Sequence, residues 1–162
     1  MSPRLVDPGA ASPALLARVH ALNAAHAEAT SPLTLQDLAA MARAAFHARA
    51  TEDGAAFLLA FDERADYASA NFRWFRDRYA RFVYVDRIVV DAARQGAGLG
   101  RRLYADLFAA ARAAGKPRVA CEVNRVPPNP GSDAFHARLG FAPVGEGQPA
   151  PGKTVRYLVR PL

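Results

Sequence analysis

The chain has 162 residues, of which 51% are hydrophobic, so it is long enough for one filled core and we expect a single domain over residues 1–162. No apolar stretch approaches the roughly 20 residues of a membrane-spanning helix, and no signal peptide pattern opens the chain, so we expect a soluble cytoplasmic protein. Cys121 is the only cysteine and the four histidines are not at ligand spacing, which excludes an internal disulfide and predicts no metal site.

Strand and helix patterns alternate along the first half of the sequence. The helices are predicted from apolar residues at helical spacing, and the strands from apolar runs bounded by turn residues such as Asp53-Gly54. The expected elements are a short strand at 4–6, a helix at 13–28, a helix to residue 44 after the N-cap Thr34, a strand at 46–50, a strand at 55–61 and a short aromatic helix at 71–79.

The second half continues the alternation and ends in a pair of strands. Gly115 and Pro117 end one helix, whereas Asn129 and Pro130 suit the N-cap and first position of another. The expected elements are a central strand at 82–90, a helix at 101–114, a strand at 118–124, a helix from Pro130, and strands near 142–144 and 154–159.

A glycine-rich turn, Gln95-Gly96-Ala97-Gly98-Leu99-Gly100, joins the central strand to the next helix. Such a turn directs several backbone N–H groups and the positive end of a helix dipole toward one point, where a phosphate binds well. No Gly-Lys-Ser/Thr follows, as a P-loop requires, and Arg101 stands where a dinucleotide-binding turn has its third glycine. The sequence therefore predicts a phosphate site of another kind.

Two segments resemble the GNAT superfamily of N-acetyltransferases. Gln95-x-x-Gly98-x-Gly100 resembles the loop that binds the pyrophosphate of acyl-CoA, and the segment from Asn129 to Phe141 resembles the later Asn-x-x-Ala-x-x-Phe-Tyr-x-x-Leu-Gly-Phe block. The run Phe-Val-Tyr-Val-Asp-Arg-Ile-Val-Val also looks like a bacterial group of predicted acetyltransferases.

This resemblance implies an α/β acyltransferase fold, with a central mixed, mostly antiparallel sheet flanked by helices. It also implies an N-acetyltransferase that moves the acetyl group of acetyl-CoA to a primary amine, of a small molecule or a peptide N-terminus, by direct attack on the thioester. The alternative is a module that binds acyl-CoA without catalysis, as a sensor or regulator. The acceptor is not identified, and a homodimer is left open.

The resemblance also assigns the groups that bind acetyl-CoA. A backbone N–H near Ile88 would stabilise the oxyanion, Val90 would hold the pantetheine arm, and the loop amides would hold the diphosphate. The expected cofactor-binding residues are Ile88, Val89, Val90, Arg94, Gln95, Gly96, Ala97, Gly98, Leu99, Gly100, Arg101, Arg102, Asn129, Ser132 and Phe135.

The formal net charge of +6 has a use in this interpretation, because CoA is strongly anionic and three of the arginines lie at the loop. The other arginines are spread along the chain rather than gathered in a basic run, so we expect no nucleic acid partner.

The expected general base is Glu122. Cys121-Glu122-Val123 resembles the Leu-Glu-Val segment of the ribosomal-protein alanine acetyltransferases, in which the glutamate is the base. Here Val123 is six positions before Asn129, where that group has four, so an inserted turn changes the surroundings. The alternative is a structural carboxylate paired with an arginine such as Arg87 or Arg118.

Tyr84 and Asp86 are the other candidates for the base. Residues of one strand that are two apart share a face, so both lie on the same face as Ile88 and Val90.

The expected acid is His136, at the position where the superfamily has a tyrosine. An imidazolium with a pKa of about 6.5 can protonate a thiolate whose thiol has a pKa near 8.5. The alternative is a histidine that packs beside Phe135 while the thiolate leaves unassisted. The acceptor would enter beside Asn23 and the aromatic segment that contains Phe72, Trp74 and Phe75, although such aromatics are more often core than a ligand cage.

Overall fold

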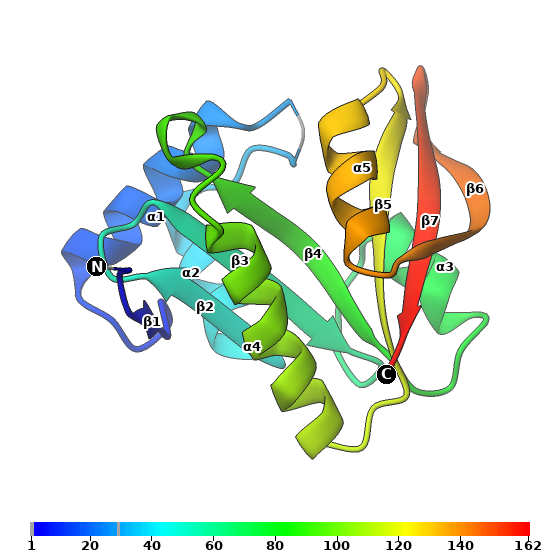
Figure 1. The fold of residues 1–162 in the computed structure, drawn as a ribbon, viewed down its shortest axis with the longest axis horizontal. Helices are drawn as coiled ribbons and strands as arrows, with labels where there is room; N and C mark the ends of the chain where they lie inside the picture. The colour runs from blue at the N-terminus through cyan, green and yellow to red at the C-terminus, as the bar shows by residue number, and fades with distance from the viewer. Residues whose placement is uncertain (1, 29) are drawn as a thin grey trace. The chain divides into compact units, whose positions relative to one another are not determined.

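The structure of the protein, a computed structural model, describes residues 2–28 and 30–162. Its elements follow the order that the sequence predicts (Figure 1). They are β1 (Leu5–Val6), α1 (Pro13–Ala25), α2 (Leu35–Ala44), β2 (His47–Thr51), β3 (Ala56–Asp62), α3 (Ala70–Arg76), β4 (Val83–Val90), the 3-10 turn η1 (Ala92–Arg94), α4 (Leu99–Ala113), β5 (Arg118–Val126), α5 (Pro130–Arg138), β6 (Ala142–Ala150) and β7 (Lys153–Pro161).

The predicted helix caps are confirmed, whereas several predicted boundaries were wrong. Thr34 accepts a hydrogen bond from the Asp37 amide at 3.0 Å, and Asn129 accepts one from the Ser132 amide at 3.3 Å. Helix α1 ends at Ala25 and α4 begins at Leu99, so the first is shorter and the second longer than expected. Strands β6 and β7 have 9 residues each, which makes both longer than the sequence predicts.

The strands form a seven-stranded sheet in the order β1-β2-β3-β4-β5-β7-β6. β4 and β5 pair in parallel, whereas β2 pairs antiparallel with β1 and β3, and β7 pairs antiparallel with β5 and β6. The expected α/β fold with a mixed, mostly antiparallel sheet and flanking helices is therefore confirmed.

The chain divides into two compact units. Unit 1 consists of Met1–Phe61 and Val85–Ala110, and unit 2 of Asp62–Tyr84 and Ala111–Leu162. β4 begins in unit 2 and continues into unit 1. The expectation of a single domain stays a prediction.

In unit 1, α1 and α2 cover one face of the strands and α4 covers the other (Figure 1). The core on the first face consists of side chains from both helices and from β2, β3 and β4. These are Leu15, Val19, Leu22, Leu38, Ala42, Ala48, Ala50, Phe57, Leu59 and Val89. This core is almost wholly aliphatic, and Ala42, Ala48 and Ala50 are among its members.

In unit 2, α3 and α5 lie on opposite faces of the strands (Figure 1). Phe72 and Phe75 of α3 are fully buried, and their rings contact Tyr84 of β4 at centroid distances of 5.8 Å. Phe75 also contacts Tyr157 of β7 at 5.3 Å. The aromatic segment of the sequence therefore forms the core under α3, which favours the packing interpretation over a ligand cage.

Within the described residues, none of the helices combines the length and the apolar character that crossing a membrane requires.

Thr51, at the end of β2, gives the first test of this fold. Its fully buried side chain accepts hydrogen bonds from the amides of Ala55 and Ala56 at 2.9 and 3.1 Å. Thr51→Val keeps the shape but removes this buried acceptor from both amides, of which that of Ala55 also donates to the Asp53 carboxylate at 3.1 Å, so we expect a loss of about 1–3 kcal/mol in the free energy of unfolding. Urea denaturation measures it, with the half-exposed Thr154→Val in β7 as a control that changes stability by less than about 0.5 kcal/mol. Equal losses in the two variants would contradict this role of Thr51.

Candidate active site

The glycine-rich loop of unit 1 has a backbone that only glycine adopts without strain. Gly96 and Gly98 have φ angles of +86° and +81°, in the left-handed region. A Cβ atom built on either residue would meet no atom within 4 Å. Glycine is therefore required here by the backbone conformation rather than by crowding within the protein, and the space beside the loop is open.

Helix α4 follows this loop directly. The Arg102 amide donates the first helical hydrogen bond, to the Gly98 carbonyl at 3.1 Å. The N–H groups that precede it have no carbonyl one turn earlier in the helix, and the helix dipole is positive at this end. The predicted loop thus presents backbone donors and a partial positive charge at the same place.

Three arginines accompany the loop. Arg94 forms an ion pair with Asp53 at 3.0 Å, and Arg101 is exposed. The Nη1 atom of Arg102 is buried and has no hydrogen-bond partner among the described residues. A buried cationic donor without an acceptor is costly, so this guanidinium is a candidate to bind an anionic ligand.

The end of β4 alternates as expected. Ile88 and Val90 are half-buried, while Val89 is buried in the core of unit 1. Asp86 shares the face of Ile88, and its carboxylate forms an ion pair with the Arg87 Nε atom at 2.7 Å. Both side chains of this pair are about 5% exposed or less.

Arg87 also binds the last turn of α1 and the connection that follows it. Its Nη1 atom donates to the Asn23 side chain at 3.0 Å, and its Nη2 atom to the Ser31 hydroxyl at 3.2 Å. Asp86 therefore balances a buried guanidinium that joins this connection to β4, which favours a structural role for Asp86. Asn23, a predicted acceptor-side residue, is fully buried in this network.

In unit 2, the Glu122 carboxylate accepts hydrogen bonds from two neutral side chains. The Tyr84 hydroxyl donates to Oε2 at 2.7 Å, and the Asn71 amide donates to Oε1 at 3.1 Å. Glu122 itself is half-buried. The structure thus brings two predicted residues together, with Tyr84 as a hydrogen-bond donor to Glu122 rather than as a separate base.

Tyr157 extends this group. It lies directly opposite Glu122 in the β5–β7 register, and its hydroxyl donates to the Asn71 side-chain oxygen at 2.9 Å. Burial and the negative charge of Glu122 raise the pKa of the Tyr157 hydroxyl, against the opposing effect of Arg78. Tyr157 is therefore a neutral donor at physiological pH.

The sequence did not identify Asn71 or Tyr157. They are 86 positions apart, and Asn71 and Glu122 are 51 apart, so no local pattern connects them. The one signal available was the aromatic segment, in which Asn71 is a polar residue among rings.

His136 of α5 is buried between the edges of two rings, with its ring centroid 5.3 Å from those of Phe135 and Phe141. Its Nδ1 atom lies 2.8 Å from the Ser132 carbonyl. A carbonyl only accepts, so Nδ1 carries the proton and Nε2 has none in the neutral ring. Burial lowers the pKa of this histidine, against the opposing effects of that carbonyl and Asp133.

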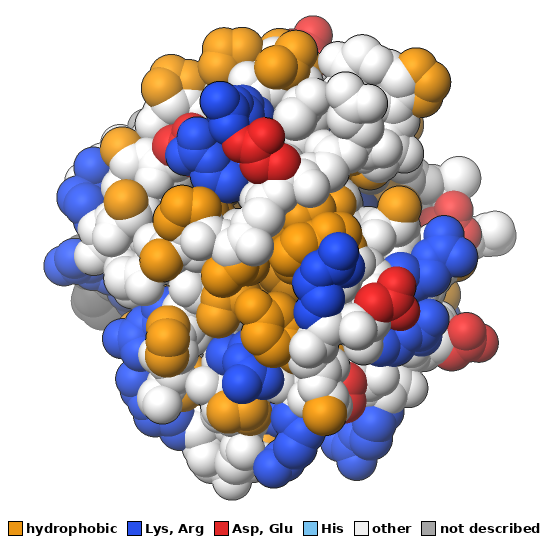
Figure 2. Space-filling model, turned by 90° about the vertical axis from the view of Figure 1, so that its right-hand side faces the viewer, with side chains coloured by type: hydrophobic (Ala, Val, Ile, Leu, Met, Phe, Trp, Pro, Cys, Tyr) orange, Lys and Arg blue, Asp and Glu red, His pale blue; other side chains and the backbone are white. Residues whose placement is uncertain are grey.

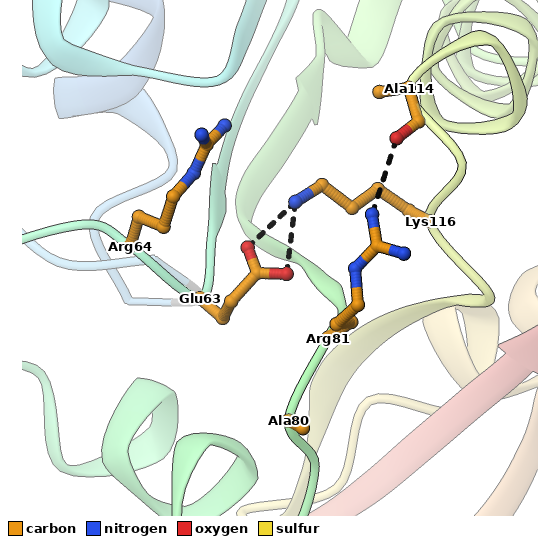
Figure 3. A pocket seen from close by; sticks show the side chains of 6 residues that line it. All are labelled: Glu63, Arg64, Ala80, Arg81, Ala114 and Lys116. Atoms are coloured by element: carbon orange, nitrogen blue, oxygen red, sulfur yellow. Dashed lines mark hydrogen bonds and ion pairs between the residues drawn. The ribbon is translucent and has the colours of Figure 1, made fainter.

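A pocket of about 330 Å³ in unit 2 lies away from the predicted residues. Lys116 and Glu63 meet across it (Figure 3), with the ammonium 2.7 Å from the carboxylate, and the same ammonium lies 3.2 Å from Asp62. Arg81 donates to the Ala114 carbonyl at 3.4 Å. Because its charged groups are bound to one another, this pocket is a weaker candidate for a ligand site than the glycine-rich loop.

Figure 2 shows Lys and Arg side chains around an apolar patch on one face, with Asp and Glu side chains among them. Unit 2 contains ion pairs between side chains of these two kinds, including Arg125 with Glu146 and Arg156 with Asp133.

In the part of the chain that the structure describes, no group of three or more His, Cys, Asp and Glu residues is arranged to hold a metal ion.

A family model, described as the acetyltransferase (GNAT) family, matches residues 21–141. The chain therefore belongs to this acetyltransferase family, and the family that the two segments predict is confirmed. None of the curated protein sequences matches the chain. The more specific resemblance to a bacterial group stays a prediction.

Several solved structures have a similar fold. The NatC complex bound to Gag peptide and CoA matches with a TM-score of 0.74 and 10% identity, covering 100% of this chain and 99% of that chain. The structure of Salmonella typhimurium yncA with acetyl-CoA matches with a TM-score of 0.70 and 17% identity, covering 99% of this chain and 94% of that chain. The Escherichia coli ribosomal-protein-S18-alanine N-acetyltransferase matches with a TM-score of 0.64 and 16% identity, covering 98% of this chain and 92% of that chain. At these identities the likeness shows the fold alone.

The protonation state of His136 gives a second test. We expect its pKa below the usual value near 6.5, because burial disfavours the charged ring. Nitrogen NMR over pH about 5 to 8 should show the neutral ring with the proton on Nδ1 throughout the upper part of the range. The unfolded chain then binds a proton more readily than the folded one, so this histidine destabilises the fold as the pH falls. A protonated ring at neutral pH would contradict the effect of burial.

Proposed function

We propose that the protein transfers the acetyl group of acetyl-CoA to a primary amine, of a small molecule or a peptide N-terminus, by direct attack on the thioester. The observation that carries the proposal is the loop of Gly96 and Gly98, with open space beside it and the start of α4 behind it. Family membership and the acetyl-CoA in the yncA structure support it.

The proposed cofactor site begins with the loop. Amide groups between Gln95 and Arg101 donate to the diphosphate, apart from that of Ala97, which donates to the Arg94 carbonyl at 3.3 Å. The Nη1 atom of Arg102, which has no partner among the described residues, supplies a cationic donor. We propose that the Ile88 amide stabilises the oxyanion and that Val90 holds the pantetheine arm. Arg94, and the groups of Asn129, Ser132 and Phe135, stay predictions for this site.

Glu122 is the proposed general base. In the reaction the amine nitrogen forms a bond to the thioester carbon, the bond from carbon to sulfur breaks, and the amine loses a proton. The Glu122 carboxylate is a group of the kind that accepts such a proton, and Tyr84 and Asn71 donate to its two oxygens without carrying a charge. Both donors fix its orientation, as base catalysis requires.

The departing thiolate takes up a proton. The expected role of His136 as its donor stays a prediction, and burial makes the imidazolium rarer at neutral pH than for a free histidine. A cytoplasmic location, a homodimer and the lack of a nucleic acid partner also stay predictions.

Gly98→Ala tests the loop. An alanine Cβ would project into the open space that the diphosphate is proposed to occupy, so we expect the Kd for CoA to rise at least about tenfold in calorimetry. Gly152→Ala, in the turn between β6 and β7, is the matched control, because Gly152 has a φ of +76° and a Cβ there also meets nothing within 4 Å. The control has the same backbone strain and should bind CoA normally. A similar change in Kd for both variants would contradict the loop assignment.

Glu122→Gln tests the base. Gln keeps the size but cannot take up the proton, so we expect kcat to fall about 10²–10⁴-fold with little change in the KM for acetyl-CoA. Thiol release from acetyl-CoA across amino acids, polyamines, aminoglycosides and peptides with free N-termini is the assay. Normal CoA binding without turnover for any amine would instead favour the non-catalytic sensor, and undiminished turnover in Glu122→Gln would exclude this residue as the base.

A further inference from the structure

We propose that Asn71 is a positioning residue that holds the Glu122 carboxylate in the orientation needed to accept a proton, and that Tyr157 in turn holds Asn71. This inference rests on the proposed role of Glu122 as the base. It assigns a positioning function to α3, the short aromatic helix that the sequence places beside the acceptor or in the core.

The two ends of the Asn71 amide have different partners, and the chemistry fixes which end faces which. Ionised Glu122 only accepts hydrogen bonds, so the NH₂ group of Asn71 must face it, at 3.1 Å. The side-chain oxygen then faces Tyr157, whose hydroxyl donates at 2.9 Å. A reversed amide would place its oxygen against the carboxylate and lose the bond to Glu122.

Asn71 is held in place by the packing of its helix. It is the second residue of α3, which begins after the N-cap Ser69, whose hydroxyl accepts from the Phe72 amide at 3.3 Å. The next residue, Phe72, is fully buried and contacts the Phe82 ring at a centroid distance of 5.7 Å. The amide is therefore presented by a helix end that cannot shift without opening an aromatic core.

Tyr157 is fixed as firmly. Trp74 of α3 stacks on its ring at a centroid distance of 4.1 Å, and the Arg78 guanidinium lies over Trp74 at 3.8 Å. A Cβ on Gly145 of β6 would come within 2.6 Å of Trp74, so the indole also fills the space against that strand. The hydroxyl of Tyr157 is thus aimed at Asn71 by stacked rings.

Orientation matters for Glu122 because the last torsion of a glutamate side chain is broad. Tyr84 binds one carboxylate oxygen and Asn71 the other. Loss of Asn71 removes the hydrogen bond that restrains one of the two oxygens, and a misplaced base lowers the rate although it remains ionised. We therefore expect an effect on kcat rather than on the KM for acetyl-CoA.

The test is a double-mutant cycle of Asn71→Leu with Glu122→Gln. Asn71→Leu should lower kcat about 10–100-fold and leave the KM for acetyl-CoA nearly unchanged. In the Glu122→Gln background the same substitution should have no further effect, because Asn71 acts through a group that is already disabled. The proposal is overturned if the losses in kcat of the two single variants add up in the double variant. It is also overturned if Asn71→Leu has a wild-type kcat while Glu122→Gln is inactive.

Two further variants keep the test independent of misfolding. Tyr157→Phe removes only the hydroxyl and leaves the ring stacked on Trp74, and it should give a smaller fall in kcat than Asn71→Leu. Arg73→Ala, on the exposed side of α3, is the matched control and should leave kcat unchanged. If Arg73→Ala lowers kcat as much as Asn71→Leu does, the loss comes from a general disturbance of α3 rather than from the Asn71 amide, and the proposal fails.

A spectroscopic measurement separates this inference from the proposed function. The Asn71 side-chain amide protons, observed by nitrogen NMR, should move when Glu122 becomes Gln and stay in place in Arg73→Ala. This signal reports the hydrogen bond whether or not the protein turns over substrate. If the Asn71 signal moves but Glu122→Gln turns over substrate as fast as the wild type, Glu122 is not the base and the positioning role fails with it. If the Asn71 signal does not move, only the positioning role is overturned.

Discussion

The constraint on which unit 2 depends is that a carboxylate in a strand of a closely packed sheet must be given hydrogen-bond donors. Glu122 is half-buried in β5, and an ionised carboxylate without partners there would cost several kcal/mol. Tyr84 comes from β4 and Asn71 from α3, so the requirement connects a neighbouring strand and a helix whose rings also pack against each other. A polar network inside such a core allows few alternative arrangements.

Unit 1 meets a different requirement with its backbone. The loop around Gly96 and Gly98 presents main-chain donors, and side chains at these positions would be strained and would occupy the space that a ligand needs. Arg102 adds a cationic donor that the protein leaves without an acceptor among the described residues. Unit 1 thus supplies groups suited to binding an anion, and unit 2 supplies groups suited to moving a proton.

Local sequence signals predicted the parts of the site that are formed locally. The glycine turn and the cap at Asn129 could be located because each depends on residues within a few positions. Asn71 and Tyr157 could not, because the packing of α3 on β7 brings them together. The length of β6 was missed for a related reason: it contains Gly145 and Gly147 rather than alternating apolar residues. A Cβ at Gly145 would come within 2.6 Å of the Trp74 ring, and one at Gly147 within 2.7 Å of the Tyr157 hydroxyl.

Asp86 and Glu122, the two carboxylates considered as the base, differ in the charge of the hydrogen-bond partners that remain when the carboxylate is protonated. If Asp86 took up a proton, the Arg87 guanidinium, whose side chain is 4% exposed, would remain as a buried cation without its ion-pair partner. If Glu122 took up a proton, the Tyr84 phenol and the Asn71 amide that donate to it would not become unpaired charges, because both are neutral. With respect to these hydrogen-bond partners, acceptance of a proton therefore costs less at Glu122 than at Asp86, although both lie on strands of the same sheet. This difference follows from the charge of the partners named, which the sequence does not show.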